Sequence, residues 1–349
     1  MNCIKVSEKE IGGNKTFIVA EIGANHNNDI TTIKKTIDKA KECGVDAVKF
    51  QTYTARDLLV DYDRVLEYES NGVIKNKSIG TLFDELALPR QWHEEIFQYA
   101  KKQGLIAFST PFSIDGVRFL SGINVPIFKV AASDVNYVDM LIELSKHNKP
   151  IILSLGKCTL SEADRAIEIL KSNGVKQLII MHCVSKYPSP MEEMNLNVIK
   201  SLKVLYPDLI IGFSDHSTGI TASLGAVALG AKVIEKHFTL DKTLEGPDHW
   251  FSMDPSEMKS LVDGIRDLEK AFGDSRKRVL ECEKDEREKS IRSLVIKNSK
   301  KAGETIEEED LLMLRPGYGI SPFDKDKVIG MKLSNDKKAM SVLQWKDFK

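Results

Sequence analysis

Eight short apolar runs, separated by longer stretches of helical pattern, constrain the fold of this chain more than any other feature of its sequence. Each run is rich in β-branched and aromatic residues and lacks the polar alternation of a strand with one wet face. Most of the segments between them carry apolar residues at spacings of three and four, and several end on glycine. The runs are TFIVAEI, DAVKFQ, LIAFST, VPIFKVA, PIILSL, QLIIMHC, DLIIGFS and KVIEKHF.

Continuous apolar strands joined by helices predict a parallel sheet, because parallel strands need crossover connections and are covered on both faces. Eight such units predict a (β/α)8 barrel, which we expect to occupy residues 1–272. An open doubly wound sheet is the alternative, but its phosphate-binding pattern GxGxxG is absent from the sequence. The long segment 52–89 follows the second run, and an insertion at that end of a barrel strand is usually part of the active-site rim.

The rest of the chain predicts a charged linker at residues 273–290 and a small β-rich domain at residues 291–349. A domain of that size buries little core, so we expect it to dock on another surface. The whole chain has 349 residues, 42% of them hydrophobic, and a formal net charge of -1. This composition gives no indication of a nucleic-acid partner. No apolar stretch has membrane-spanning length and no signal-peptide core is present, so we expect a cytoplasmic protein.

Polar residues stand at the carboxyl ends of the predicted strands, where (β/α)8 barrels carry their catalytic groups. A single lysine in an apolar run is usually a snorkelling or edge residue. Lys49 and Lys129 together, with hydroxyl groups at neighbouring strand ends, instead predict a site for a phosphorylated or carboxylated anion. The polar strand-end residues are Glu21, Lys49, Gln51, Ser109, Thr110, Lys129, Ser133, Ser154, His182, Ser214, His216, Glu235 and His237.

Two histidines, His216 and His237, end consecutive runs. Adjacent strand ends can bring imidazoles close enough to share one divalent metal, which would act as a Lewis acid on a carbonyl. His182 fits a buried hydrogen-bonded role and a site role equally well. His93 lies in a helical surface pattern and is expected to face solvent. Asp215 fits either a supporting role beside the metal or a strand-end cap.

Seven phrases occur in one order over nearly the whole chain: AEIGANH, VKFQTY, FSTPF, FSDHSTG, ALGAKVIEKHFTLDK, GPDHWFS and RPGYGI. Their combination resembles the sialic-acid (nonulosonic-acid) synthase family, of the N-acetylneuraminate synthase type. The C-terminal region resembles the antifreeze-like (SAF) domain fused to these synthases. The resemblance implies condensation of phosphoenolpyruvate with an open-chain N-acylated amino sugar, either N-acetylmannosamine or a 2,4-diacetamido-trideoxyhexose. The products would be a nonulosonic acid and phosphate.

The resemblance also implies a cofactor, an assembly and a role for individual residues. It implies a divalent cation, Mn²⁺ or Mg²⁺, held by His216 and His237, and catalytic roles for Glu21 and Asp248. It implies a domain-swapped homodimer in which Arg315 reaches the acyl group of the sugar in the partner subunit. The substrate-binding positions that it implies are Lys49, Gln51, Thr110, Lys129, Ser133, Asp134, Ser154, Ser185, Tyr187, Ser214 and Arg315.

The sequence departs from the family pattern at positions that concern the choice of sugar. Ser185 stands where the family often has asparagine, AASD replaces GSGE, and SLGK replaces STGM. GPDHWFS resembles the N-acetylneuraminate and legionaminate branches, whereas ANH and QTYT resemble the pseudaminate branch. Two alternatives remain: another metal-dependent barrel aldolase or synthase that uses a sugar phosphate, and a non-catalytic carbohydrate-binding protein. The two lysines and both histidines argue against the second.

Overall fold

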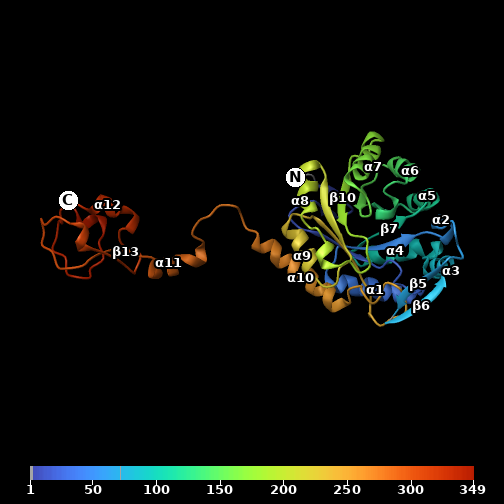
Figure 1. The fold of residues 1–349 in the computed structure, drawn as a ribbon, viewed down its shortest axis with the longest axis horizontal. Helices are drawn as coiled ribbons and strands as arrows, with labels where there is room; N and C mark the ends of the chain where they lie inside the picture. Colours follow the sequence, from blue (N-terminus) through green and yellow to red (C-terminus); the bar gives the residue numbers. More distant parts are fainter. Residues whose placement is uncertain (1–2, 71) are drawn as a thin grey trace. The chain divides into compact units, whose positions relative to one another are not determined.

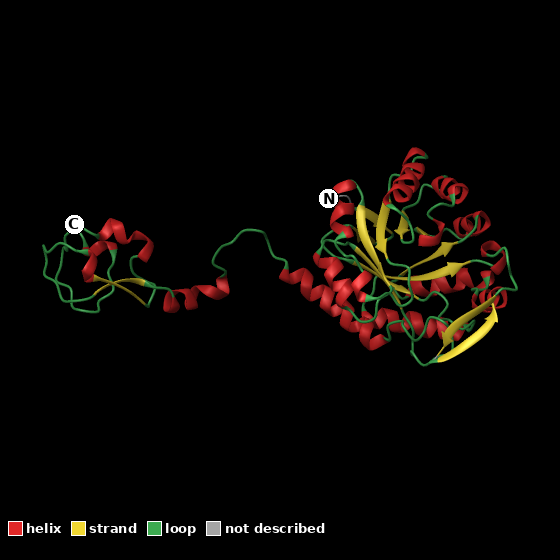
Figure 2. Cartoon of the chain, in the orientation of Figure 1, coloured by secondary structure: helices red, strands yellow, loops and turns green. Residues whose placement is uncertain are grey.

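The computed structural model describes residues 3–70 and 72–349. The chain divides into two compact units, residues 1–273 and 274–349. The first unit is a barrel of eight parallel strands surrounded by helices (Figures 1 and 2). All eight runs form strands, which confirms the predicted fold. The strands are β3 (Phe17–Glu21), β4 (Ala47–Thr52), β7 (Ile106–Pro111), β8 (Phe128–Val130), β9 (Ile151–Leu155), β10 (Leu178–Cys183), β11 (Ile210–Asp215) and β12 (Val233–His237).

The strands follow one another around the barrel in chain order. β3 pairs in parallel with both β4 and β12, so the first barrel strand joins the last. β7 and β8 lie side by side but are the two ends of the hydrogen-bonded sheet, so the ring is nearly closed. The surrounding helices are α1 (Ile30–Cys43), α4 (His93–Lys102), α5 (Ile114–Gly122), α6 (Val138–Ser145), α7 (Leu160–Ser172), α8 (Val198–Leu205), α9 (Thr221–Ala228) and α10 (Pro255–Ala271).

The helix α1 illustrates how local sequence sets these elements. Asp29 caps its start by accepting hydrogen bonds from the backbone N–H groups of Thr31 and Thr32. Gly44 ends it with φ 87°, a left-handed conformation that glycine adopts without steric cost. Between these ends, apolar residues at spacings of three and four, including Ile33 and Ile37, are buried against the strands.

The amino-terminal end of the barrel is filled with apolar side chains. A small antiparallel hairpin, β1 (Ile4–Val6) and β2 (Lys9–Ile11), contributes Ile4, Val6 and Ile11 to this cluster. Inward-facing strand residues such as Phe17 and Phe108 complete it. The amino-terminal half of the barrel interior is therefore a packed core, so a ligand inside the barrel would bind toward the carboxyl ends of the strands.

The insertion (residues 52–89) has its own secondary structure. It contains the short helix α2 (Ala55–Leu58), an antiparallel hairpin of β5 (Val65–Ser70) and β6 (Val73–Ser78), and the helix α3 (Ile79–Leu86). A 3-10 turn, Arg90–Trp92, then leads into α4. The insertion thus adds a small structured element next to the end of β4, in the blue and cyan part of Figure 1.

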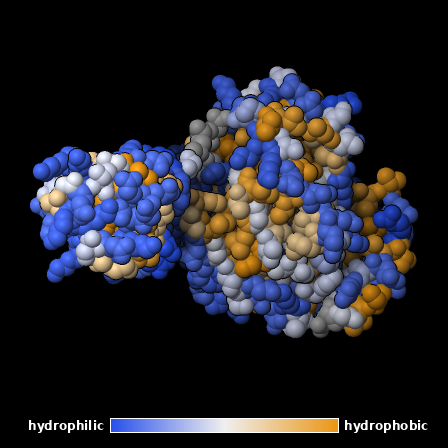
Figure 3. Space-filling model, turned by 60° about the vertical axis from the view of Figure 1, so that its left-hand side comes forward, coloured by the Kyte–Doolittle hydropathy of each residue, from blue (hydrophilic) through white to orange (hydrophobic). Residues whose placement is uncertain are grey.

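The second unit begins with a charged, exposed stretch that includes α11 (Lys284–Ser290). It continues with the paired strands β13 (Ser293–Ile296) and β14 (Leu311–Leu314) and the helix α12 (Lys325–Val328). Its surface in Figure 3 is mainly hydrophilic. No helix in the described parts of the chain is long and apolar enough to cross a membrane. The small core consists of Leu294, Ile296, Ile306, Ile320, Val328, Leu333 and Leu343.

Candidate active site

Polar side chains form a layer directly above the packed core of the barrel. Each stands two positions after an apolar residue of that core, because alternate residues of a strand point to the same face. On β12, for example, Val233 belongs to the core, whereas Glu235 and His237 follow on the same face. The other pairs are Val19 and Glu21, Ala47 and Lys49, Phe108 and Thr110, Ile127 and Lys129, Ile152 and Ser154, and Met181 and Cys183.

This layer lines a cavity of about 200 Å³, called here the anion cavity. The structure brings most of the predicted site residues together in its wall. Asp134 and Asp248 are not among the lining residues, and Arg315 belongs to the second unit. The predicted residues that line the anion cavity are Glu21, Lys49, Gln51, Thr110, Lys129, Ser133, Ser154, Ser185, Tyr187, Ser214, His216 and His237.

Two buried lysines face each other across a carboxylate in the anion cavity. The Lys49 Nζ lies 3.1 Å from Glu235 Oε1, and the Lys129 Nζ lies 3.7 Å from the same oxygen. The Lys129 Nζ also donates a hydrogen bond to Ser154 Oγ at 2.7 Å. Both lysines are about as buried as the core, with 5% and 2% of their surface exposed. Their ammonium groups are therefore fixed in position before any ligand arrives.

The pKa values of the two carboxyl groups in the anion cavity are shifted in opposite directions. Burial favours the neutral form of Glu235, but Lys129 and Lys49 outweigh it and lower its pKa to about 2. Burial raises the pKa of Glu21, although Lys49 opposes this. For Lys49, burial lowers the pKa, but Glu21 and Glu235 more than offset it. Burial lowers the pKa of Lys129, and Glu235 opposes this. Two buried lysines beside one firmly ionised carboxylate suit an anionic ligand that takes over part of their charge pairing.

His216 and His237 lie side by side on the wall of the anion cavity, with ring centroids 5.4 Å apart. Burial lowers the pKa of His216 to about 4 and that of His237 well below its ordinary value, so both imidazoles are neutral. The Nδ1 of His216 lies 3.1 Å from the carbonyl oxygen of Val184. Since a carbonyl only accepts, this nitrogen carries the proton, and Nε2 keeps its lone pair.

The histidine pair fits a divalent cation that takes its remaining ligands from water or substrate. The Nδ1 of His237 is buried without a hydrogen bond, as expected of an atom awaiting another partner. No group of three or more His, Cys, Asp or Glu side chains in the described residues is arranged to hold a metal ion. Two neutral imidazoles could thus supply only part of a coordination sphere.

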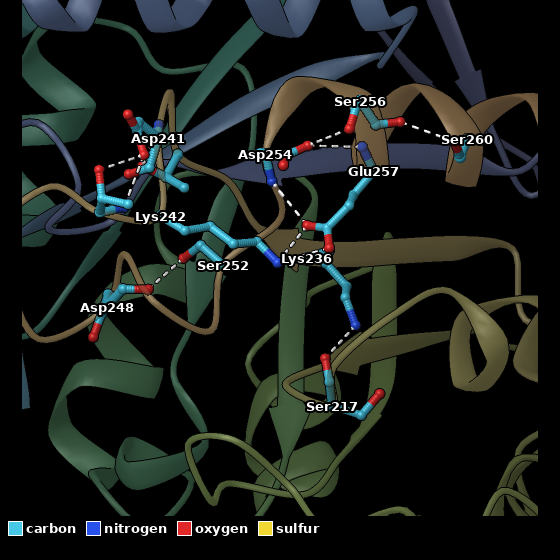
Figure 4. Close-up of polar contacts among 12 residues, drawn as sticks. Ser217, Lys236, Asp241, Lys242, Asp248, Ser252, Asp254, Ser256, Glu257 and Ser260 are labelled. Carbon is cyan, nitrogen blue, oxygen red and sulfur yellow. Dashed lines mark hydrogen bonds and ion pairs between the residues drawn. The ribbon is translucent and has the colours of Figure 1, made fainter. Parts of the chain in front are cut away.

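Asp248 lies in the loop after β12, beside the histidine pair. Its Oδ2 is 3.5 Å from His237 Nδ1. Burial raises the pKa of Asp248 to about 7, and Glu21 adds to this effect. The backbone of the loop is held by Ser252, whose hydroxyl donates to the carbonyl oxygen of Asp248 at 2.6 Å (Figure 4). A carboxyl group with this pKa can accept or give a proton near neutral pH.

His93, His182 and Asp215 have structural roles outside the anion cavity. His93 was expected to face solvent, but it is fully buried and contacts Thr52 Oγ1 at 2.8 Å. His182 contacts the carbonyl oxygen of Met194 at 2.8 Å, and it does not line the anion cavity. Asp215 faces away from the cavity and pairs with Lys236 at 2.8 Å; Figure 4 shows Lys236 beside Ser217, which it also contacts.

Glu235 is the central side chain that the sequence interpretation did not assign to the site. It had been noted as a strand-end residue, but only the structure shows that it contacts both lysines and accepts a hydrogen bond from Ser214 Oγ at 3.2 Å. The sequence could have indicated its role, because Glu235 lies two positions before His237 and that spacing places both side chains on the same face of a strand. Lys157 and Cys183 also line the cavity without having been predicted.

Asp134 does not line the anion cavity, and its predicted role in substrate binding stays a prediction. It follows Ser133 in the 3-10 turn Ala132–Asp134, and consecutive residues of a turn point in different directions. Ser133 lines the anion cavity, whereas Asp134 does not, and its Oδ2 is buried without a hydrogen bond. Burial raises the pKa of Asp134 to about 6, with Lys129 and Lys157 opposing.

Asp134→Asn is expected to stabilise the protein at pH 8 and to have little effect below pH 4. Because the folded-state pKa is raised above the ordinary value of 3.8, the group favours folding at low pH. This contribution is lost as the pH rises through about 6. Since the side chain is partly exposed, we expect the variant to gain about 1 kcal/mol in unfolding free energy at pH 8. Urea unfolding at both pH values tests this, and an equal difference at both would contradict it.

Comparison with known proteins identifies relatives over nearly the whole chain. A model of the NeuB family matches residues 36–277, and a model of the SAF domain matches residues 291–349. The N,N'-diacetyllegionaminic acid synthase of Campylobacter jejuni is 39% identical over 318 residues, which cover 90% of this chain and 95% of that protein. The pseudaminic acid synthase of the same organism is 37% identical over 336 residues, covering 96% and 97%.

A solved structure gives the same picture. The N-acetylneuraminic acid synthetase from Leptospira borgpetersenii, crystallised with citrate, is 31% identical to this chain and superposes with a TM-score of 0.74. The match covers 82% of this chain and 95% of that one.

Proposed function

This chain belongs to the NeuB family and carries a SAF domain, and from that premise we propose that it condenses phosphoenolpyruvate with an N-acylated amino sugar. The products are a nonulosonic acid and inorganic phosphate. The observation that carries the proposal is the pair of buried lysines, Lys49 and Lys129, beside a histidine pair in one cavity. The two relatives that match 90% and 96% of this chain are named as synthases of such acids, which supports the same reaction class.

The anion cavity is suited to phosphoenolpyruvate by charge and by donors. Phosphoenolpyruvate carries a carboxylate and a phosphate, and Lys49 and Lys129 supply two fixed cations for them. Hydroxyl groups of Thr110 and Ser154 contact the two lysines, and that of Ser214 contacts Glu235; all three can donate to the remaining oxygens. The ligand would take over contacts that the lysines now make with Glu21 and Glu235.

The reaction forms one carbon–carbon bond and replaces the C2–O bond to phosphate with a C2–O bond from water. C3 of phosphoenolpyruvate adds to the aldehyde carbon of the open-chain sugar, and the aldehyde oxygen takes a proton. Water then adds to C2, and the C2–O bond to phosphate breaks, which leaves the 2-keto acid. Glu21 and Asp248 would orient that water or move its proton, and their raised pKa values near the histidine pair support this role.

A divalent cation, Mn²⁺ or Mg²⁺, would be held by His216 and His237. When bound, such an ion supplies Lewis-acid polarisation of the aldehyde oxygen. The Asp248 carboxyl group, 3.5 Å from His237 Nδ1, would orient that imidazole or a water beside it. Tyr187 packs on both imidazoles, with its ring centroid 4.4 Å from that of His216, and restricts their movement.

The test is release of phosphate from phosphoenolpyruvate by the full-length protein, with Mn²⁺ or with a chelator. Release is expected only when an N-acylated amino sugar is also present, and it should stop when the chelator is added. Release that needs no sugar would contradict the proposal, as would turnover of a sugar phosphate without phosphoenolpyruvate.

We also propose that the working form is a domain-swapped homodimer in which Arg315 contacts the acyl group of the sugar. Arg315 lies in the second unit, where it is exposed. Arg315→Ala is expected to raise KM for the sugar by about tenfold, because a charge-assisted hydrogen bond is worth roughly 1.5–3 kcal/mol. KM for phosphoenolpyruvate should not change. Steady-state kinetics and light scattering test this, and an active monomer would contradict it.

A further inference from the structure

Lys157 is a third lysine in the lining of the anion cavity, and it differs from Lys49 and Lys129 in its exposure. Those two are buried, whereas Lys157 is exposed to solvent at the rim of the cavity. It lies between β9 and α7, two positions after the last residue of β9. The family pattern STGM has methionine at this position, so that pattern does not account for the charge.

The turn that carries Lys157 packs closely against the wall of the anion cavity. Gly156 is buried, and a methyl group added to it would overlap the Ser185 hydroxyl and lie 2.9 Å from the Cβ of Ala132. Lys157 itself has φ 56°, a left-handed conformation that is uncommon for residues with a Cβ atom. Residues held in such conformations cluster at ligand-binding sites. The turn thus places Lys157 next to two residues of the cavity wall.

The buried charges of the anion cavity already pair with one another. The Lys49 Nζ lies 3.3 Å from Glu21 Oε2 and 3.1 Å from Glu235 Oε1. The Lys129 Nζ lies 3.7 Å from the same Glu235 oxygen. Lys157, by contrast, forms no salt bridge with any residue in the described parts of the chain. A ligand with both a phosphate and a carboxylate brings more negative charge than the buried lysines can match, which leaves some for a cation at the rim.

The part of the cavity wall next to Lys157 also offers hydroxyl groups. Ser185 lies beside the turn, and Ser154, at the end of the same strand, accepts a hydrogen bond from Lys129 Nζ at 2.7 Å. Burial raises the pKa of Asp134, and Lys129 and Lys157 both oppose this, so their two charges act on one region. A phosphate group presents three acceptor oxygens and up to two charges, so it matches these donors better than a carboxylate does.

We infer that Lys157 is a rim cation that binds the phosphate group of phosphoenolpyruvate together with the buried Lys129. The inference rests on the proposed condensation, because that reaction supplies the ligand. Since Lys157 is open to solvent, its contribution to binding is screened by salt, whereas that of a buried lysine is screened much less. An exposed cation at the mouth of a cavity also speeds the arrival of an anion.

Lys157→Met is expected to raise the Kd for phosphoenolpyruvate by about tenfold at an ionic strength of about 0.01 M, because one charge-assisted contact is lost. In about 1 M salt the variant and the wild-type protein should agree within about threefold, since the screening length falls from about 30 Å to about 3 Å. Lys157→Arg keeps the charge on a side chain that is also unbranched at Cβ, so it should bind as the wild-type protein does. Calorimetric titration of the full-length protein with Mn²⁺ and without sugar measures each Kd.

Lys176→Met is the matched control for the change in net charge. Lys176 is also exposed, but it lies just before β10, at the opposite end of the barrel, and it does not line the anion cavity. This variant is expected to bind phosphoenolpyruvate as the wild-type protein does at both ionic strengths. Inorganic phosphate tests which end of the ligand is bound. It should compete with phosphoenolpyruvate, and Lys157→Met should weaken it by about the same factor.

The possible results separate this inference from the proposed function. If Lys157→Met bound phosphoenolpyruvate as tightly as the wild-type protein at low ionic strength, or if Lys176→Met weakened binding equally, Lys157 would not be a rim cation. An unchanged affinity for inorganic phosphate in Lys157→Met would contradict its assignment to the phosphate group. The condensation would stand in each of these cases. If the wild-type protein did not bind phosphoenolpyruvate, the proposed function and the inference would both be wrong.

Discussion

Lys129→Met is expected to lower kcat/KM for phosphoenolpyruvate by about a thousandfold, because truncating one member of a buried charge pair usually costs 2–5 kcal/mol of binding. The Lys129 ammonium group is 2% exposed, donates to Ser154 Oγ and lies 3.7 Å from Glu235. An anion in the cavity would lose one of its two cations. Methionine keeps most of the side-chain volume, so the change removes charge more than packing.

The barrel is expected to remain folded in Lys129→Met. Glu235 keeps its contact with the Lys49 ammonium group, 3.1 Å away, so the substitution leaves no buried carboxylate without a cation. Initial rates at varied phosphoenolpyruvate, together with thermal unfolding, separate the loss of binding from a loss of structure.

Lys236→Met is the matched control, since Lys236 is also a buried lysine on a barrel strand. Its side chain faces away from the anion cavity and pairs with Asp215 at 2.8 Å. Its loss leaves the Asp215 carboxylate buried without its cation, which is expected to destabilise the fold by about 3–5 kcal/mol. KM for phosphoenolpyruvate in the folded fraction should stay the same. If Lys129→Met changed only the stability, or if Lys236→Met changed only KM for phosphoenolpyruvate, the roles assigned to the two lysines would be wrong.

The barrel could be predicted from sequence because its strands are covered on both faces. Runs such as PIILSL show neither the period of a helix nor polar alternation, and helical segments follow them at regular intervals. The position of Lys49 was also predictable, because a strand's register fixes the face of each residue. Phe50, its neighbour, points outward and packs on Phe97 of α4, so Lys49 points into the barrel.

Residues outside regular strands were harder to place. Asp134 and Ser133 are neighbours in a turn, and no period tells which of them faces the cavity. His93 was misplaced because its burial comes from contacts with Thr52, a residue distant in sequence. Asp248 reaches His237 only through the course of a loop held by Ser252 and Asn25. The second cavity, which is lined by Tyr53, Leu66 and Phe83, depends on how the insertion (residues 52–89) packs, which no local pattern encodes.

His237→Ala is expected to weaken Mn²⁺ binding by roughly 100-fold or more, beyond the 10- to 100-fold effect typical of losing a supporting residue. The imidazole is neutral, and its Nδ1 is buried without a hydrogen bond, so the side chain is available as a ligand. Turnover with phosphoenolpyruvate and sugar should fall to the level of the chelated wild-type protein. Titration of free Mn²⁺ by electron paramagnetic resonance measures binding without any substrate.

His182→Ala provides the control for the loss of a buried imidazole. His182 also stands near the end of a barrel strand, but it contacts the Met194 carbonyl oxygen and stacks on Phe213 outside the anion cavity. This variant is expected to unfold at a lower temperature and to bind Mn²⁺ as the wild-type protein does. If His237→Ala retained wild-type affinity for Mn²⁺, the histidine pair would not be the metal site. Both variants lose the same side-chain volume. A general loosening of the barrel would therefore affect Mn²⁺ binding in both and could not by itself explain a difference between them.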